Sequence, residues 1–336
     1  MATYKGIRGV TIPTVAGDPS NLALGDIWYN NVAQAIKVGQ TTAAAWATGT
    51  SMGTARGETC GCGLQTAALI IGGDGGASHP NPTPAVGETE IYDGSSWTES
   101  GDLNKHRDNP AGNMGTTTAA IVAGGGPQAA APGVVNNAET FDGSSWTEGA
   151  DLTVAKGAGG GSGTTTAAIH FGGGTMAALD TVEEWNGTSW SEIADLIVAK
   201  LWFGQAGDSS TAALAFGGSP FPKATNEEWN GTAWSEEVDL NTARVYIDGT
   251  GSSTLALGIN GDTNTSGAHS ATVEEWDGTS WTETADTSKE AANAGSAGTT
   301  SAGLKAAGSG PPGNTLLTHT EEFTGAFAAA ATISSS

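Results

Sequence analysis

Residues 181–196 read TVEEWNGTSWSEIADL, and residues 225–240 read TNEEWNGTAWSEEVDL. In both copies an Asn-Gly pair separates two short segments, which is the strongest local signal for a β-hairpin because both turn residues accept positive φ. The second tryptophan of this motif recurs at intervals of 44 to 49 residues, at Trp97, Trp146, Trp190, Trp234 and Trp281. A hairpin repeated in this way predicts a fold built from similar units that bury their faces against one another.

The rest of each repeat supplies further strands. An aromatic residue lies five positions before each tryptophan, and in four copies a basic residue follows ten positions after it. A strand of small residues ending in glycines comes next, as in TAAIHFGGG at 166–174. Together these segments predict one four-stranded sheet per 44–51 residues, which is the period of β-propeller blades.

The double glycine after an apolar strand, the aromatic-Asp-Gly turn, the tryptophan and the basic residue resemble the blade pattern of the kelch family. The resemblance extends over roughly residues 46–325. It implies an all-β fold, a six-bladed kelch-like β-propeller with four-stranded blades. Propellers host many unrelated activities, so the resemblance by itself implies no function.

The repeats predict how the ring closes. There are six glycine-strand units but five complete hairpins, because the sixth begins as EEFTG at 321–325 and then loses the pattern. Near the other end of the chain, Trp46 precedes Arg56 by the same ten residues. We therefore expect residues near 44–50 to supply the outer strand of the blade built from 291–325, which would latch two bare sheet edges. The alternative is that AFAAAATI at 326–333 forms that strand itself. The expected domains are residues 1–43 and the propeller at 44–336.

One glutamate recurs in every blade, at Glu90, Glu139, Glu183, Glu227, Glu274 and Glu321. One interpretation is a ring of carboxylates around a channel. The other is a scaffold role, in which each glutamate supports its blade through a hydrogen bond or ion pair with a per-blade Arg or Lys. Repetition in every blade favours the scaffold, since a binding site on a ring usually breaks the symmetry. We assign the repeated tryptophans, Trp46 included, to outer-strand packing in the same way, and not to platforms for sugars.

Residues 1–43 lie outside the repeat. GDIWYNN at 25–31 predicts a second kind of hairpin, with Ile27, Trp28 and Tyr29 in a strand and Asn30 in the turn. This stretch resembles a short motif of tail-fibre and other appendage proteins of bacteriophages, although the usual Asn-Gly-Thr-x-Trp ending is replaced by GQTTAAAW. The resemblance implies that these four residues belong to a docking unit.

The segment IRGVTIPTVAGDPSN at 7–21 precedes this hairpin. We expect it to be an extended docking arm that reaches a neighbouring subunit; a free terminus is the alternative.

The amino-acid composition limits the kinds of molecule that the protein can bind. The 336 residues carry a formal charge of -23, which disfavours nucleic acid and anionic membranes, and no apolar run is long enough to span a bilayer. The two cysteines, Cys60 and Cys62, exclude a disulfide framework and offer too few ligands for a closed zinc site. We expect them to be small buried or loop thiols.

No catalytic arrangement is recognisable, and we expect neither enzymatic activity nor a cofactor or metal. The five histidines are scattered without ligand spacing, and the glycine-rich stretches lack the surrounding βαβ unit of a nucleotide site. Two glycine-strand residues break the apolar pattern, His170 and Lys305, and are weak candidates for a ligand contact. The irregular insertions at 74–88, 126–137, 218–226 and 309–319 are better candidates for recognition, because binding usually sits in loops on a rigid scaffold.

Arrays of the EEWNGTSW type behind such an N-terminal segment resemble structural proteins of marine phages. The resemblance implies a virion protein of the tail or fibre apparatus, assembled in the host cytoplasm and acting outside cells. It would dock through its N-terminal arm onto other virion proteins or copies of itself and present the propeller outward, for assembly or host-surface attachment. The alternative function is a lectin-like propeller that binds a glycan on a bacterial or viral surface.

Overall fold

The computed structural model describes residues 12–20, 22–23, 25–76, 85–126, 133–174, 177–264 and 267–333. Every regular element within these residues is a β-strand, so the all-β prediction is confirmed. None of the described residues forms a helix that could cross a bilayer. The chain divides into two compact units: one contains the residues up to Ala45 together with those from Gly325 onward, and the other runs from Trp46 to Thr324.

The first unit is a single sheet with the strand order β1-β2-β3-β30. Its strands are β1 (Thr14–Val15), β2 (Ile27–Asn30), β3 (Ala35–Thr42) and β30 (Phe327–Thr332). β2 and β3 form the hairpin predicted from GDIWYNN. β1 pairs with β2 in parallel, so the described part of the predicted arm folds back onto this hairpin instead of standing free. The rest of the arm, residues 1–11, lies outside the described residues.

The described residues of the second unit form six four-stranded sheets. The first three contain β5 (Cys60–Leu64), β6 (Ala67–Ile71), β7 (Thr89–Tyr92) and β8 (Trp97–Glu99); β9 (Gly115–Thr116), β10 (Ala119–Ala123), β11 (Ala138–Phe141) and β12 (Trp146–Glu148); and β13 (Gly160–Gly163), β14 (Ala168–Phe171), β15 (Val182–Trp185) and β16 (Trp190–Glu192). The next two contain β17 (Gly204–Ser209), β18 (Ala212–Phe216), β19 (Asn226–Trp229) and β20 (Trp234–Glu237); and β21 (Asp248–Gly251), β22 (Ala256–Ile259), β23 (Val273–Trp276) and β24 (Trp281–Glu283). The last contains β25 (Gly295–Gly298), β26 (Ala302–Ala306), β29 (Thr320–Thr324) and β4 (Ala45–Thr48). A small hairpin of β27 (Ser309–Gly310) and β28 (Thr315–Leu316) precedes β29.

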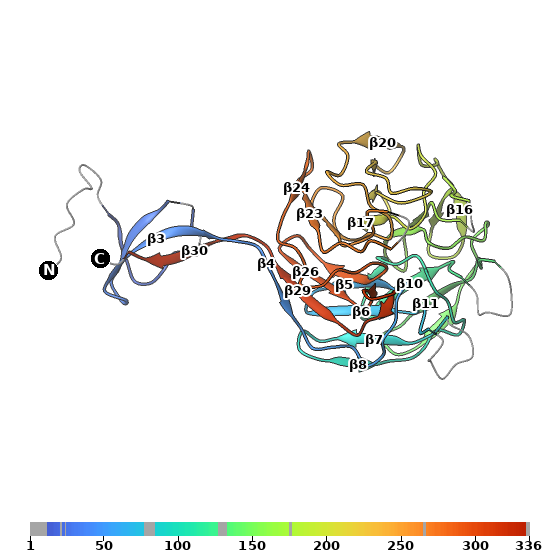
Figure 1. Ribbon diagram of the computed structural model, residues 1–336, viewed down its shortest axis with the longest axis horizontal. Helices are drawn as coiled ribbons and strands as arrows, with labels where there is room; N and C mark the ends of the chain where they lie inside the picture. The colour runs from blue at the N-terminus through green and yellow to red at the C-terminus, as the bar shows by residue number, and fades with distance from the viewer. Residues whose placement is uncertain are drawn as a thin grey trace. The chain divides into compact units, whose positions relative to one another are not determined.

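The sheets follow one another around an axis, as Figure 1 shows. The first strands of successive sheets contact one another, and β25 contacts β5, so the series returns to its start. This is the architecture of a β-propeller. The strands nearest the axis are rich in glycine because space there is short: a Cβ on Gly161 would lie 2.6 Å from the carbonyl oxygen of Gly112 in the preceding sheet.

The apolar core lies between neighbouring sheets. Leu69 and Ile71 of β6, for example, pack in one cluster with Val122, Phe141 and Trp146 of the next sheet. Each such side chain, when fully buried, contributes about 1.5–3 kcal/mol to stability. The repeated large aliphatic of the glycine strand therefore holds one sheet to the next.

The strand exchange between the chain ends is confirmed. β4, which contains Trp46, is the outer strand of the sheet built from β25, β26 and β29. The alternative is wrong: AFAAAATI forms β30, which pairs with β3 over six residue pairs in the first unit. Consequently the predicted propeller range of 44–336 needs correction, because the second unit ends at Thr324 and the C-terminal strand completes the sheet of the N-terminal hairpin.

Candidate binding site

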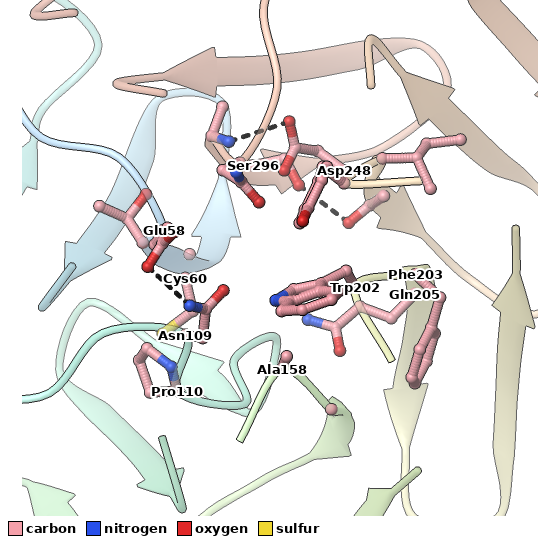
Figure 2. Close-up of a pocket in the computed structure, with 18 residues that line it drawn as sticks. Glu58, Cys60, Asn109, Pro110, Ala158, Trp202, Phe203, Gln205, Asp248 and Ser296 are labelled. Atoms are coloured by element: carbon pink, nitrogen blue, oxygen red, sulfur yellow. Dashed lines mark hydrogen bonds between the residues drawn. The ribbon is translucent and has the colours of Figure 1, made fainter. Parts of the chain in front are cut away.

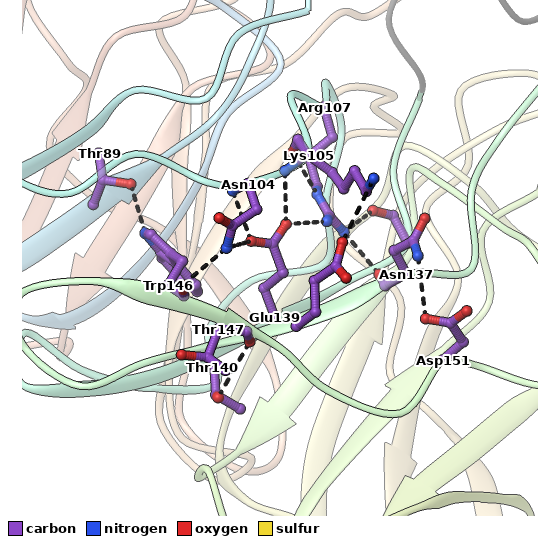
Figure 3. Close-up of polar contacts among 12 residues, drawn as sticks. Thr89, Asn104, Lys105, Arg107, Asn137, Glu139, Thr140, Trp146, Thr147 and Asp151 are labelled. Carbon is purple, nitrogen blue, oxygen red and sulfur yellow. Dashed lines mark hydrogen bonds and ion pairs between the residues drawn. The ribbon is translucent and has the colours of Figure 1, made fainter.

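The first five repeated glutamates form ion pairs, each with the basic residue that follows the tryptophan of the preceding repeat. In the second sheet, Arg107 Nη2 lies 2.5 Å from Glu139 Oε1, and neither side chain is exposed (Figure 3). The same carboxylate accepts hydrogen bonds from the backbone N–H groups of Asn104 and Lys105, at 2.8 and 3.1 Å. The equivalent pairs are Arg56–Glu90 at 3.2 Å, Lys156–Glu183 at 3.4 Å, Lys200–Glu227 at 2.9 Å and Arg244–Glu274 at 2.8 Å. This is the arrangement that the scaffold interpretation requires.

The sixth sheet departs from this pattern. Ala291 occupies the position ten residues after Trp281, where the other repeats have Arg or Lys. Glu321 keeps the backbone hydrogen bond of the pattern, from the N–H of Ser288 at 2.7 Å, but its charged neighbour is His319, whose Nε2 lies 3.2 Å away. Lys305 is directly opposite Glu321 in the β26–β29 register, fully buried, and its Nζ has no hydrogen-bond partner among the described residues. Burial lowers the pKa of Lys305, and the nearby charge of Glu321 opposes this effect.

His170 is also interior. It lies in β14 with no exposed surface, and neither ring nitrogen has a hydrogen-bond partner among the described residues. Burial, reinforced by the nearby charge of Lys156, holds its pKa well below the usual value. Neither His170 nor Lys305 belongs to the residues that line the axial pocket defined below.

The repeated tryptophans pack between blades. Trp146, Trp190, Trp234 and Trp281 are 4–7 % exposed. Trp97 and Trp46 are half-buried; the Trp46 indole N–H donates to the carbonyl of Ala285 at 2.9 Å, and its ring lies 5.1 Å from that of Phe323. None of these six indole rings lies exposed at the surface as a flat face on which a sugar could stack.

In the first unit, two of the four predicted docking residues have internal partners. Trp28 and Asn30 are buried and both donate to Asp18 Oδ1, at 3.1 and 2.7 Å. Asn30 Oδ1 also accepts the N–H groups that follow it and so fixes the turn. Ile27 and Tyr29, on the other face of β2, are half-buried.

One position per blade, two residues after the scaffold cation, surrounds the axis. These six residues, which we call the axial ring, are Glu58, Asn109, Ala158, Trp202, Tyr246 and Asn293. Each donates its backbone N–H to the carbonyl of the preceding member, at 2.8–3.2 Å, and the first donates to the last, so the hydrogen bonds close a circle. All six have φ between +45° and +55°, which is uncommon for residues other than glycine and an outlier for a bulky side chain.

The axial ring lines a pocket of about 70 Å³, the axial pocket (Figure 2). Its backbone is symmetric but its side chains are not. Trp202 and Tyr246 contact each other with ring centroids 5.0 Å apart, and across the circle Asn109 donates to Glu58 Oε2 at 2.7 Å. Deeper in the pocket lie Thr59, Cys60 and Asp248, and the lining contains no Lys, Arg or His.

Burial dominates the electrostatics of the axial pocket. It raises the pKa of Glu58 to about 7, helped by the neighbouring charges of Asp108 and Asp74. It raises the pKa of Asp248 to about 8, against the opposing effect of Lys305. Both cysteines are free, buried thiols, and burial raises the pKa of Cys62 to about 12. The pocket thus contains two carboxyl groups that burial keeps protonated to a higher pH than usual, and no basic side chain lines it.

The inner strands run from this pocket to a wider cavity at the other end of the axis. That cavity, of about 600 Å³, is lined by residues near the ends of the inner strands, such as Gly63, Gly163 and Asp208. Of the four insertions singled out from the sequence, 218–226 and 309–319 are described throughout, whereas 77–84 and 127–132 in the other two lie outside the described residues. Within the described residues no group of three His, Cys, Asp or Glu is placed to hold a metal ion.

The axial ring was not identified from the sequence, although a signal for it exists. The cation two positions earlier is nearly constant, whereas this column reads Glu, Asn, Ala, Trp, Tyr and Asn in successive repeats. A position that varies from repeat to repeat while its neighbours stay constant is one whose side chain is not needed to hold the blades together.

These features define a β-propeller protein with a separate small sheet. No family model and no curated protein matches the chain. Among solved structures, the chain is similar to the structure of YjhT, a kelch-like β-propeller, with a TM-score of 0.67 and 11 % sequence identity over 83 % of this chain and 99 % of that one. At this identity the similarity establishes the fold alone.

Proposed function

We propose that the chain is a non-catalytic structural protein of a bacteriophage particle, in its tail or fibre apparatus. The supporting observation is the first unit, which gathers both ends of the chain into one sheet around the GDIWYNN hairpin. A sheet of this kind suits an anchor, because two chain connections join it to the propeller and share any mechanical force between the two units.

The docking contact belongs to this first unit, with other virion proteins or further copies of the chain as partners. β30 is an edge strand of six residues, FAAAAT, and presents one side of its backbone to a partner. Addition of a strand to such an edge is a recurrent mode of protein recognition. The propeller then faces outward, where its loops are free for attachment to a host surface.

The assembly role is tested on particles. We expect peptides from both ends of the chain in density-purified virions, at a stoichiometry that stays constant across gradient fractions. A chain trimmed to residues 45–324 keeps β4 and therefore the whole propeller, and we expect it to fold but to be missing from assembled particles. Full-length protein found only free or on cell envelopes would overturn the proposal.

A second candidate function is glycan binding, and the axial pocket favours it. Trp202 and Tyr246 offer aromatic surface beside the polar groups of Asn109 and Glu58, a combination suited to a ligand with apolar and polar faces. A glycan screen on residues 45–324 separates the two functions, because a lectin keeps its binding after the first unit is removed.

A further inference from the structure

The side chains that line the axial pocket include two acidic groups and no basic group. Glu58 and Asp248 line it, Asp248 is 9 % exposed, and no basic side chain reaches the lining. Thr59 also belongs to the lining, but its hydroxyl oxygen is inaccessible to solvent, so the acidic groups that a ligand meets are those of Glu58 and Asp248. A buried carboxylate without a basic partner is costly, so a pocket with this lining favours a ligand that brings a positive charge.

The aromatic side of the pocket narrows the choice of ligand. In the hydrogen-bonded circle Trp202 is three positions from Glu58, which places the indole across the axis from the carboxylate. A group held between them therefore lies beside a carboxyl group on one side and the indole ring on the other. Both attract cations, and substituted ammonium groups are the cations that aromatic faces recognise best.

The size of the pocket sets a further limit. By the same measure a single water needs about 10–15 Å³, so 70 Å³ accepts roughly five water-sized groups. A trimethylammonium or aminomethyl group fits this space, whereas a complete hexose does not. The remainder of a larger ligand would stay outside the mouth of the pocket.

We infer that the axial pocket binds a substituted ammonium group, held between Glu58 and Trp202 and carried by a small molecule or sugar that stays outside the mouth. The carboxyl group of Asp248 lines the same pocket. The inference is independent of the particle role, because a free propeller could use the same pocket. Two sources provide this chemistry, namely choline compounds and amino sugars.

The test compares cations with neutral molecules of the same shape. Full-length protein is titrated calorimetrically at constant ionic strength with choline and with 3,3-dimethyl-1-butanol, in which carbon replaces the charged nitrogen. Glucosamine and N-acetylglucosamine form the second pair. We expect one cation to bind about tenfold or more tightly than its neutral partner, within the range up to about 10 mM that suits a small fragment. The pair that shows the difference identifies the source.

Variants locate the binding. Glu58→Gln keeps the shape and the acceptor for Asn109 and is expected to weaken cation binding about tenfold. Trp202→Leu keeps apolar volume without the aromatic face and should act in the same direction. Glu192→Gln removes the same charge at an exposed site on an outer strand and should change nothing. Equal affinity for cation and neutral partner, no binding of either cation, or a loss equally large in Glu192→Gln would overturn the inference.

Discussion

Each scaffold glutamate is a buried charge that depends on one cation. Because Glu139 has no exposed surface, Arg107→Met leaves its charge without compensation. We expect a loss of about 3–5 kcal/mol in the free energy of unfolding, measured by urea denaturation. The double variant Arg107→Met/Glu139→Gln should recover most of the loss, since the amide still accepts the backbone N–H groups but carries no charge.

A surface pair provides the control for this prediction. Lys105 lies 3.5 Å from Glu148 with both side chains more than half exposed. Lys105→Met should therefore change stability by less than about 1 kcal/mol. If the single Arg107 variant were no less stable than the Lys105 variant, the glutamates would not be scaffold charges.

His170 makes stability depend on pH. Its pKa is lowered in the folded state by burial and by the charge of Lys156, while Glu183 lies opposite it in the β14–β15 register. Below the ordinary pKa of 6.5 the unfolded chain therefore binds a proton that the folded chain does not. Stability is complete above that pH and falls with increasing acidity by up to about 1.4 kcal/mol per pH unit. Denaturation of His170→Leu between pH 7 and 5 should show a slope smaller by this amount; an unchanged slope would contradict the prediction.

Glu58 gives the inferred cation site a pH dependence of its own. Its pKa of about 7 reflects burial and the charges of Asp108 and Asp74, while Asn109 lowers it and Tyr246 faces it. The carboxylate is charged above this pH and neutral below it, so the affinity for choline, whose quaternary charge does not titrate, should be higher at pH 8 than at pH 5.5. Glu58→Gln removes this titration, and its affinity should vary less over the same range. A wild-type affinity that rises on acidification would contradict the assignment.

Among the strands, β4 differs from the other outer strands. A tight turn joins each of the others to its neighbour, as Asp142-Gly143 joins β11 to β12, whereas β4 is far in sequence from β29. Trp46→Ala removes the hydrogen bond to Ala285 and the contact with Phe323. We expect hydrogen exchange to accelerate in β29 and β4 before the rest of the propeller, because this edge can open locally.

Trp190→Ala is the matched control for Trp46→Ala, because it removes the equivalent tryptophan from an outer strand that a tight turn holds in place. Trp190 is buried in β16, where the Asn186-Gly187 turn keeps the strand beside β15. The loss of packing should destabilise this variant without selective opening of its outer strand. Equal, uniform acceleration in both variants would mean that the exchanged strand is not a weak point.

The elements that could be predicted from the sequence are those whose residue pattern occurs in several repeats. β4 was predictable because Trp46 and Arg56 reproduce a spacing that is measured in the other repeats. The pairing of β30 with β3 was not, since a run of alanines has no alternation to indicate its face, and this sheet has no second copy in the chain. The axial ring was missed for a related reason: its members share a backbone conformation, which no residue type in that column reveals.

For the whole molecule, the two units predict a sharp dependence on where the chain is cut. Residues 45–324 retain β4, the Arg56–Glu90 pair and the contacts that close the series of sheets. Residues 57–324 differ by twelve residues at one end but lose that strand and leave the buried charge of Glu90 unpaired. We expect the longer fragment to keep the thermal midpoint of the propeller in the full chain, as followed by near-ultraviolet circular dichroism.

The shorter fragment should melt at least about 10 °C lower, because an unpaired buried charge alone costs about 3–5 kcal/mol and the last sheet also loses its outer strand. Equal midpoints for the two fragments would show that the propeller is stable without its exchanged strand. A lower midpoint for residues 45–324 than for the full chain would instead mean that the first unit stabilises the propeller. The comparison therefore decides whether closure depends on twelve residues of β4 and its flank or on the sheet that both chain ends form together.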